Sequence, residues 1–302
     1  MKKIHPNHKI HVNISDVVKK YKCVGMSTPF ITANKCQMLL HEDFIENRIA
    51  FVVIDAIRCS STILAAFSSG ISSMTIMVKG GEKGTKPEIA NKIATNRGKA
   101  FLLGGELNGQ PIPEGIIGNS PTEATQCEIL NNKHLHFQST NFGGSFTEVT
   151  NQLIPFIEFG GHADVFVSSF VNAESTANEI KNGNYAKVYL VAGGFYNCIS
   201  LEDNLVAGQI LHLLDINYNN MDDEARMMLS LYNTYNTPEK QYEVLKTNWI
   251  TSSLSCFGKE GDVKSIIYGD GISHDSWERM KNIVPKVIWH EKTPIIINPL
   301  NK

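Results

Sequence analysis

The sequence predicts an α/β protein with a mostly parallel or mixed sheet. Short apolar runs rich in β-branched residues recur along the chain, and stretches with helical periodicity lie between them. This alternation is typical of α/β layers. The third observation is size: 302 residues, 42% of them hydrophobic, supply enough apolar surface for a large core.

The first half of the chain alternates between strand and helix patterns. "AFVVIDAI" is predicted to be a buried strand that leads to a helix over roughly 60–69. The predicted strand "SSMTIMV" follows, then a helix that begins near Pro87 in "KGGEKGTKPEIANKIA", and then the strand "AFLLGG". The last two segments in this half are a helix, "NSPTEATQCEIL", and a strand, "HLHFQST".

The same alternation continues in the second half. "ADVFVSSF" and "AKVYLVAGG" are predicted strands, separated by the helix "NAESTANEIKNG", which Gly183 ends. "SLEDNLVAGQILHLL" is the next helix, and "VPKVIWHEKTPIIINP" contains a final strand or two. We expect one domain over residues 1–302.

A polar helical subregion at about 213–262 interrupts this pattern. It could cover a site as a lid or pack on the sheet, and we favour packing. The sequence contains no internal repeat or low-complexity linker.

Composition limits the classes of partner. The formal net charge of −2 argues against a nucleic-acid-binding protein. The six cysteines are scattered without a CxxC pair, which indicates free thiols in a reducing compartment. Neither a signal-peptide pattern nor a membrane-length apolar run occurs in the sequence. We therefore expect a cytoplasmic protein without a membrane partner.

The first polar cluster follows the strand at residues 51–54. Arg58 can form a bidentate contact with a phosphate, sulfonate or carboxylate, and Asp55 could hold a hard cation such as Mg²⁺. Ser60, Ser61 and Thr62 add hydroxyls at a helix start, where anions bind. A capped helix with one structural ion pair would also explain the pattern.

A second cluster lies in "GGELNGQPIPEGIIGNSPTEAT". Ser120, Pro121 and Glu123 predict an N-cap, a first helical residue and a capping box. Glu106 follows an apolar strand in a Gly-rich turn, as either a solvated carboxylate or a metal ligand. Asn119 precedes the predicted cap and could face the same crevice.

Two further clusters complete the candidate site. Thr140 and Asn141, in "STNFGGS", could form a backbone nest for an anion or an ordinary Gly-rich turn. Ser200 and Asp203 have capping-box spacing, so Asp203 could be only a cap. Glu202 has no such explanation, and the acidic pair could bind metal or act as general acid or base.

The order of these clusters resembles the 2-phosphosulfolactate phosphatase family, the ComB-like proteins. The matching segments are "VVIDAIRCSSTI", "GGELNGQPIPEGIIGNSPTE", "STNFGGS", "SSFVNAESTA" and "VAGGFYNCISLEDNLVAGQIL", with a weak continuation through "GKEGDV" and "IVPKVI". The resemblance implies a three-layer α/β/α fold. It also implies a Mg²⁺-dependent hydrolase that removes phosphate from a small anionic 2-phosphohydroxy acid, in coenzyme M biosynthesis.

The resemblance also suggests residue roles. Mg²⁺ would be held by Asp55 with Glu106 or with the Glu202–Asp203 pair, and the nucleophile would be a water bound to the metal or deprotonated by a carboxylate. The expected catalytic set is Asp55, Arg58, Glu106, Glu202 and Asp203, with Asp55, Glu106 and Asp203 as metal ligands. The expected substrate-binding set is Arg58, Ser60, Ser61, Thr62, Asn119, Ser120, Thr140, Asn141 and Asn172.

Two departures mark a divergent member. The family usually has Gly-Glu-Arg where this chain has Gly105-Glu106-Leu107, and a glycine where it has Phe142. Loss of a charge-assisted contact would cost about 1.5–3 kcal/mol. The substrate could therefore be another phosphorylated or carboxylated metabolite.

Two alternatives to the phosphatase stay open. One is a lyase or transferase on the same scaffold, and the other is a non-catalytic protein that binds small anions. A homo-oligomer is also left open.

Overall fold

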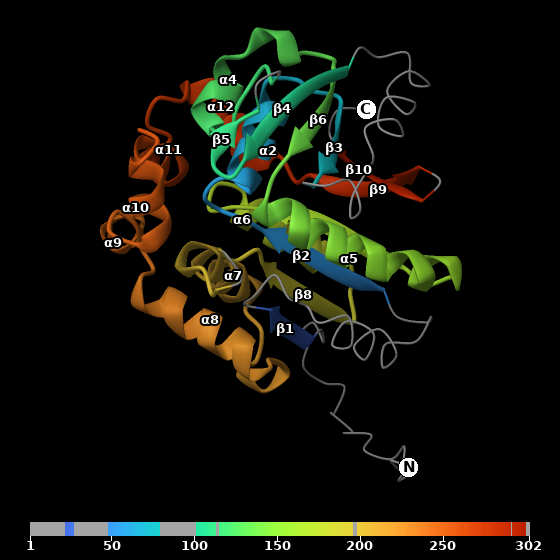
Figure 1. Ribbon diagram of the computed structural model, residues 1–302. Coiled ribbons are helices and arrows are strands. Elements are labelled where there is room, and N and C mark those ends of the chain that lie inside the picture. Colours follow the sequence, from blue (N-terminus) through green and yellow to red (C-terminus); the bar gives the residue numbers. More distant parts are fainter. Residues whose placement is uncertain are drawn as a thin grey trace, which may run out of the picture.

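One mixed sheet of ten strands organises the part of the chain that the computed structural model describes, namely residues 22–26, 48–78, 101–112, 115–195, 198–290 and 292–299 (Figure 1). The strands are β1 (Lys22–Met26), β2 (Ile49–Ile54), β3 (Ser73–Met77), β4 (Phe101–Leu107), β5 (Gln110–Pro111), β6 (His134–Gln138), β7 (Ala163–Ser168), β8 (Lys187–Ala192), β9 (Lys286–His290) and β10 (Thr293–Ile297). Their order in the sheet is β1-β8-β2-β7-β9-β10-β3-β6-β4-β5.

The sheet consists of two parallel groups joined by the C-terminal hairpin. Strands β1, β8, β2 and β7 are mutually parallel, as are β3, β6 and β4. The antiparallel hairpin β9–β10 lies between them and meets each group through a single residue pair, Phe166 with Lys286 and Met74 with Ile296. The prediction of one or two final strands is confirmed, but these strands occupy the middle of the sheet.

Helices cover both faces of the sheet. They are α2 (Cys59–Ser68), α4 (Pro121–Gln126), α5 (Asn141–Glu158), α6 (Ala173–Asn182), α7 (Leu201–Leu214), α8 (Asp223–Thr234), α9 (Pro238–Leu245), α10 (Trp249–Ser255), α11 (Gly261–Tyr268) and α12 (His274–Asn282), with 3₁₀ turns at Glu128–Leu130 and Tyr218–Asn220.

Alternation along β2 separates the core into two layers. Phe51 and Val53 belong to an apolar cluster with residues of α2 and α5. Val52 and Ile54, which point to the opposite face, belong to a second cluster with residues of α6 and α7. The predicted three-layer α/β/α architecture is thereby confirmed.

Most predicted elements match the structure, but three helices were not predicted: α5, and α11 and α12 before the final strands. The stretch 139–145 is not an isolated turn, because Asn141 begins the 18-residue helix α5, which we did not predict. Gly143 lies in its first turn, where a Cβ would come within 3.2 Å of the Met77 carbonyl oxygen, so the helix approaches β3 closely. Pro155 lies inside α5, and a proline in a helix interior argues against a helix when only the sequence is considered. The helix expected near Pro87 lies outside the described residues.

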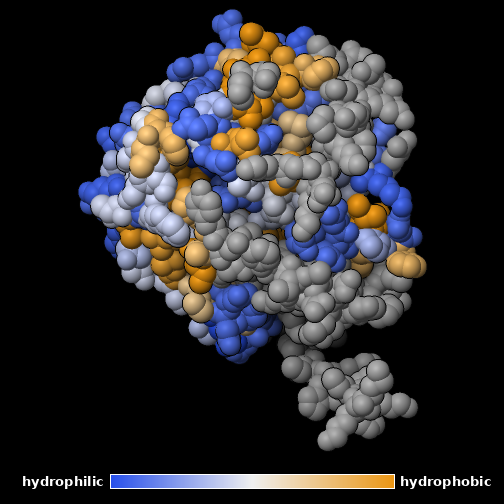
Figure 2. Space-filling model, viewed as in Figure 1, coloured by the Kyte–Doolittle hydropathy of each residue, from blue (hydrophilic) through white to orange (hydrophobic). Residues whose placement is uncertain are grey.

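The polar subregion at about 213–262 contains helices α8, α9 and α10. Their buried residues Met228, Leu245, Ile250 and Leu254 join the core cluster that contains α7. Figure 2 shows apolar residues at the surface beside hydrophilic ones on the side where α8 to α10 lie in Figure 1. In the described residues, every helix is too short or too polar to cross a bilayer.

Candidate active site

A cavity of about 250 Å³ lies where the ends of β2, β4 and β6 meet α10. Its polar lining comes from Asp55, Arg58, Glu106, Asn108, Gly109, Asn119, Ser139, Thr140 and Asn141. The remaining lining residues are Ile57, Phe195, Ile250, Ser253, Leu254, Cys256 and Phe257. Our preference for plain packing of the helical subregion was therefore incomplete, since α10 and the turn after it form one wall of the cavity.

Asp55 follows β2 directly and is buried. Its carboxylate accepts backbone N–H groups from Cys59, at 3.4 Å, and from Phe142 at the start of α5. Burial raises the pKa of the Asp55 carboxyl to about 6, and the negative charge of Glu106 acts in the same direction. Two buried carboxylates that repel each other are suited to share a cation.

Glu106 is held rigidly at the end of β4. Its Oε1 accepts the Thr140 N–H and its Oε2 the Gly109 N–H, both at 2.6 Å. The preceding Gly105 has a φ of +106°, and a Cβ there would lie 2.0 Å from the Gln138 carbonyl oxygen. Glycine is therefore required for β4 to deliver Glu106 to the cavity.

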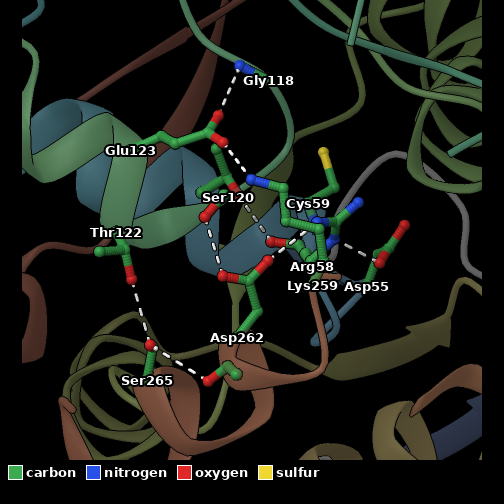
Figure 3. Close-up of polar contacts among 12 residues, drawn as sticks. Asp55, Arg58, Cys59, Gly118, Ser120, Thr122, Glu123, Lys259, Asp262 and Ser265 are labelled. Atoms are coloured by element: carbon green, nitrogen blue, oxygen red, sulfur yellow. Dashed lines mark hydrogen bonds and ion pairs between the residues drawn. The ribbon is translucent and has the colours of Figure 1, made fainter. Parts of the chain in front are cut away.

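Arg58 is bound by a residue that sequence analysis missed. The Arg58 Nη1 donates to Asp262 Oδ2 at 2.8 Å, and both side chains are buried. The other oxygen, Asp262 Oδ1, accepts the Ser120 hydroxyl at 2.8 Å, so Asp262 ties α11 to the starts of α2 and α4 (Figure 3). A guanidinium has five N–H donors, so donors remain for an anion in the cavity.

The capping box predicted at Ser120 is wrong. Ser120 is the N-cap residue and Pro121 the first helical residue, but the Ser120 side chain makes no capping hydrogen bond. Glu123 instead accepts the Gly118 N–H and pairs with Lys259 (Figure 3). Ser120 thus contacts Asp262 and does not line the cavity.

Two buried oxygens on the cavity wall have no hydrogen-bond partner among the described residues. They are Asn119 Oδ1 and Thr140 Oγ1. Burial of an unsatisfied polar atom costs about 1–3 kcal/mol, which a bound ligand or cation would relieve. The neighbouring Asn141 also lines the cavity.

Glu202 and Asp203 lie behind the cavity wall. Asp203 accepts the N–H groups of Ala56, at 2.7 Å, and Gly194, at 2.9 Å, and its own N–H donates to Ser200 Oγ, as the predicted cap requires. Burial raises the Asp203 pKa well above its usual range. Burial also raises the pKa of Glu202 to about 7, although Glu202 accepts a hydrogen bond from Asn248.

Besides Ser120, four predicted substrate-binding residues are not part of the cavity wall. Ser60 Oγ accepts the Asp55 N–H, Ser61 Oγ donates to the Ala56 carbonyl, and Thr62 Oγ1 donates to the Arg58 carbonyl. These contacts shape the turn that carries Asp55 and Arg58.

Asn172, the fourth, is fully buried, and its side chain makes four hydrogen bonds within the fold. Since these bonds use both its donors and its acceptor, the structure gives Asn172 a supporting role in place of the expected contact with substrate.

The side chains at the cavity do not form a complete set of metal ligands by themselves. In the described stretches, no group of three or more His, Cys, Asp or Glu side chains is placed to hold a metal ion. Mg²⁺, however, is usually bound through one or two carboxylates together with waters and substrate phosphates. Asp55 and Glu106, with the unpartnered oxygens of Asn119 and Thr140, fit that requirement. Asp203, the third predicted metal ligand, does not line the cavity and so does not fit it.

Comparisons with known proteins converge on one family. The family model described as 2-phosphosulpholactate phosphatase matches residues 35–273. A probable 2-phosphosulfolactate phosphatase of Thermotoga petrophila is 30% identical over 215 residues, 70% of this chain and 82% of the relative. One of Synechococcus sp. (strain JA-3-3Ab) is 28% identical over 188 residues, 61% of this chain and 69% of the relative.

Proposed function

Since the chain belongs to the 2-phosphosulfolactate phosphatase family, we propose that it removes phosphate from a small anionic 2-phosphohydroxy acid with the help of Mg²⁺. The observation that carries the proposal is the meeting of Arg58, two buried carboxylates and two unpartnered oxygens at one cavity. The expected cytoplasmic location and the link to coenzyme M biosynthesis stay predictions.

Each of the cavity residues would have a separate role in phosphate-monoester hydrolysis. Arg58 binds the phosphoryl oxygens, and its contact with Asp262 holds the guanidinium at the cavity wall. Thr140 and the amides of Asn119 and Asn141 orient the rest of the substrate. Side chains of α10 exclude bulk water, which strengthens these electrostatic contacts.

Asp55 and Glu106 would hold the metal. When bound, Mg²⁺ would neutralise charge on the phosphoryl group and make a neighbouring water a stronger nucleophile. The N–H groups of Thr140 and Gly109 fix the orientation of the Glu106 carboxylate. Burial, together with the charge of Glu106, raises the pKa of Asp55, and a bound cation would offset both effects.

Phosphate release from small phosphorylated hydroxy acids, with and without Mg²⁺, tests the proposal. Arg58→Ala and Asp55→Asn should each lower kcat/KM at least 100-fold, because each removes a contact to the reacting group or metal. Arg279→Ala and Asp275→Asn on α12 are matched controls that should retain activity, since neither residue lines the cavity.

The outcomes separate the candidate functions. Metal-dependent release that only the two cavity substitutions abolish supports the phosphatase. Turnover without phosphate release would indicate a lyase or transferase, whereas binding without turnover would indicate a non-catalytic protein.

A further inference from the structure

The cavity has two chemically different walls. Asp55, Arg58 and Glu106 lie at the polar wall, at the strand ends. The apolar wall is formed by Ile57, Phe195, Ile250, Leu254 and Phe257. Only the polar wall can replace the water that surrounds an anion.

The apolar wall is built into the fold. Ile250 and Leu254 lie four residues apart on α10, so they share a face, and both are buried in the core cluster behind the wall. The Phe195 ring stacks edge-on against Trp249 with centroids 5.1 Å apart. Phe257 lies over Gly109, where a Cβ would come within 2.8 Å of the ring. This wall therefore offers a substrate a fixed apolar surface.

Charge in the cavity limits the number of anionic groups a substrate can carry. Among the described lining residues, Arg58 is the only cation, and it already donates a hydrogen bond to Asp262. Asp55 and Glu106 add negative charge beside it. A phosphate can use Arg58 and the metal, and a single carboxylate can use the amides of Asn119 and Asn141. A third anionic group would meet no second cation among these residues, only neutral polar groups such as Asn108 and Ser139, the two carboxylates and the apolar wall.

Building on the proposed phosphatase activity, we propose that the substrate is a 2-phosphohydroxy acid whose remaining substituent is uncharged and apolar. That substituent packs against Ile250, Leu254 and Phe257, while the phosphate lies at Arg58. A sulfonated substituent is disfavoured, because the apolar wall cannot replace its hydration.

A series of four compounds that differ only in this substituent tests the inference. The phosphates of lactate (methyl), 2-hydroxy-4-methylpentanoate (isobutyl) and glycerate (hydroxymethyl) are compared with 2-phosphosulfolactate (sulfomethyl). We expect kcat/KM for the isobutyl compound to exceed that for the sulfonated one at least tenfold. Equal values, or a preference for the sulfonate, would overturn the inference but leave the phosphatase intact.

Failure of the phosphatase gives a different result. If none of the four compounds releases phosphate, the proposed function fails, and calorimetric binding of the same compounds to the wild-type protein still ranks the substituents. Tighter binding of the isobutyl compound would support the apolar wall as a specificity element. Tighter binding of the sulfonate, or equal binding, would refute it.

A cation placed on this wall should reverse the preference. Ser253 lines the cavity and is partly exposed, so Ser253→Lys adds a positive charge with little effect on the core. We expect the sulfonated compound to gain at least tenfold relative to the isobutyl one. The neighbouring Ser252 is exposed and does not line the cavity, so Ser252→Lys is the matched control and should keep the wild-type ranking. An unchanged ranking in folded Ser253→Lys would contradict the proposed arrangement.

Discussion

Removal of the Asp262 carboxylate should destabilise the protein more than any surface charge change. Arg58 and Asp262 are 5% and 7% exposed and join at 2.8 Å. Loss of one partner from a buried pair leaves the other charge uncompensated, which costs about 3–5 kcal/mol. We therefore expect Asp262→Ala to lower the free energy of unfolding by about 4 kcal/mol. Asp262→Asn should cost about half as much, because the amide oxygen can still accept from Arg58 and the amide N–H₂ can donate to Ser120 Oγ.

Urea denaturation with linear extrapolation measures these differences. Glu243→Gln is the control, since its ion pair with Lys246 is exposed and its loss should cost less than about 0.5 kcal/mol. The double variant Arg58→Met/Asp262→Leu should recover most of the lost stability, because well-packed apolar residues often replace a buried pair without penalty. A loss below about 1 kcal/mol for Asp262→Ala, or no recovery in the double variant, would refute the reasoning.

Three further predictions follow from buried groups. In the metal-free protein, the pKa values of Asp55 (about 6) and Glu202 (about 7) exceed their ordinary values of 3.8 and 4.5. The folded state therefore binds more protons than the unfolded state between these values. As a result, the free energy of unfolding should fall as pH rises from about 4 to about 7. Urea titrations across this range check the sign, and an increase in stability would contradict it. Asn172→Ala should lower the free energy of unfolding by about 2–3 kcal/mol in the same assay, while the kcat/KM of the folded enzyme stays unchanged. A loss of activity without a loss of stability would instead support the original prediction that Asn172 contacts the substrate. Gly105→Ala should destabilise the protein by at least about 2 kcal/mol, because Gly105 has a positive φ and an added Cβ would overlap the Gln138 backbone. Gly144→Ala, in open space on a helix, should instead stabilise it by up to about 1 kcal/mol. Equal melting temperatures of the two variants would refute this contrast.

Patterns within a few residues were sufficient to predict most of the framework. The run at residues 51–54 predicted β2, Ser200 predicted the start of α7, and Gly183 predicted the end of α6. These features depend on side-chain alternation and on local hydrogen bonds, which the sequence contains directly. Asp55 and Glu106, which line the cavity, were also candidates from the sequence, because Asp55 directly follows β2 and Glu106 lies at the carboxyl end of β4.

Contacts between distant segments could not be predicted in this way. Arg58 and Asp262 are 204 positions apart, and only the packing of α11 against α2 and α4 brings them together. The motif "GKEGDV" contains Asp262, but nothing local indicates its partner.

Position near a strand end did not by itself reveal which polar groups would line the cavity. The hydroxyls of Ser60, Ser61 and Thr62 found backbone partners nearby, whereas Asn119 Oδ1 and Thr140 Oγ1 were left without one. The sequence by itself determined which residues could carry the chemistry. Tertiary structure decided which of them line the cavity, because burial and the competition for hydrogen-bond partners depend on the whole fold.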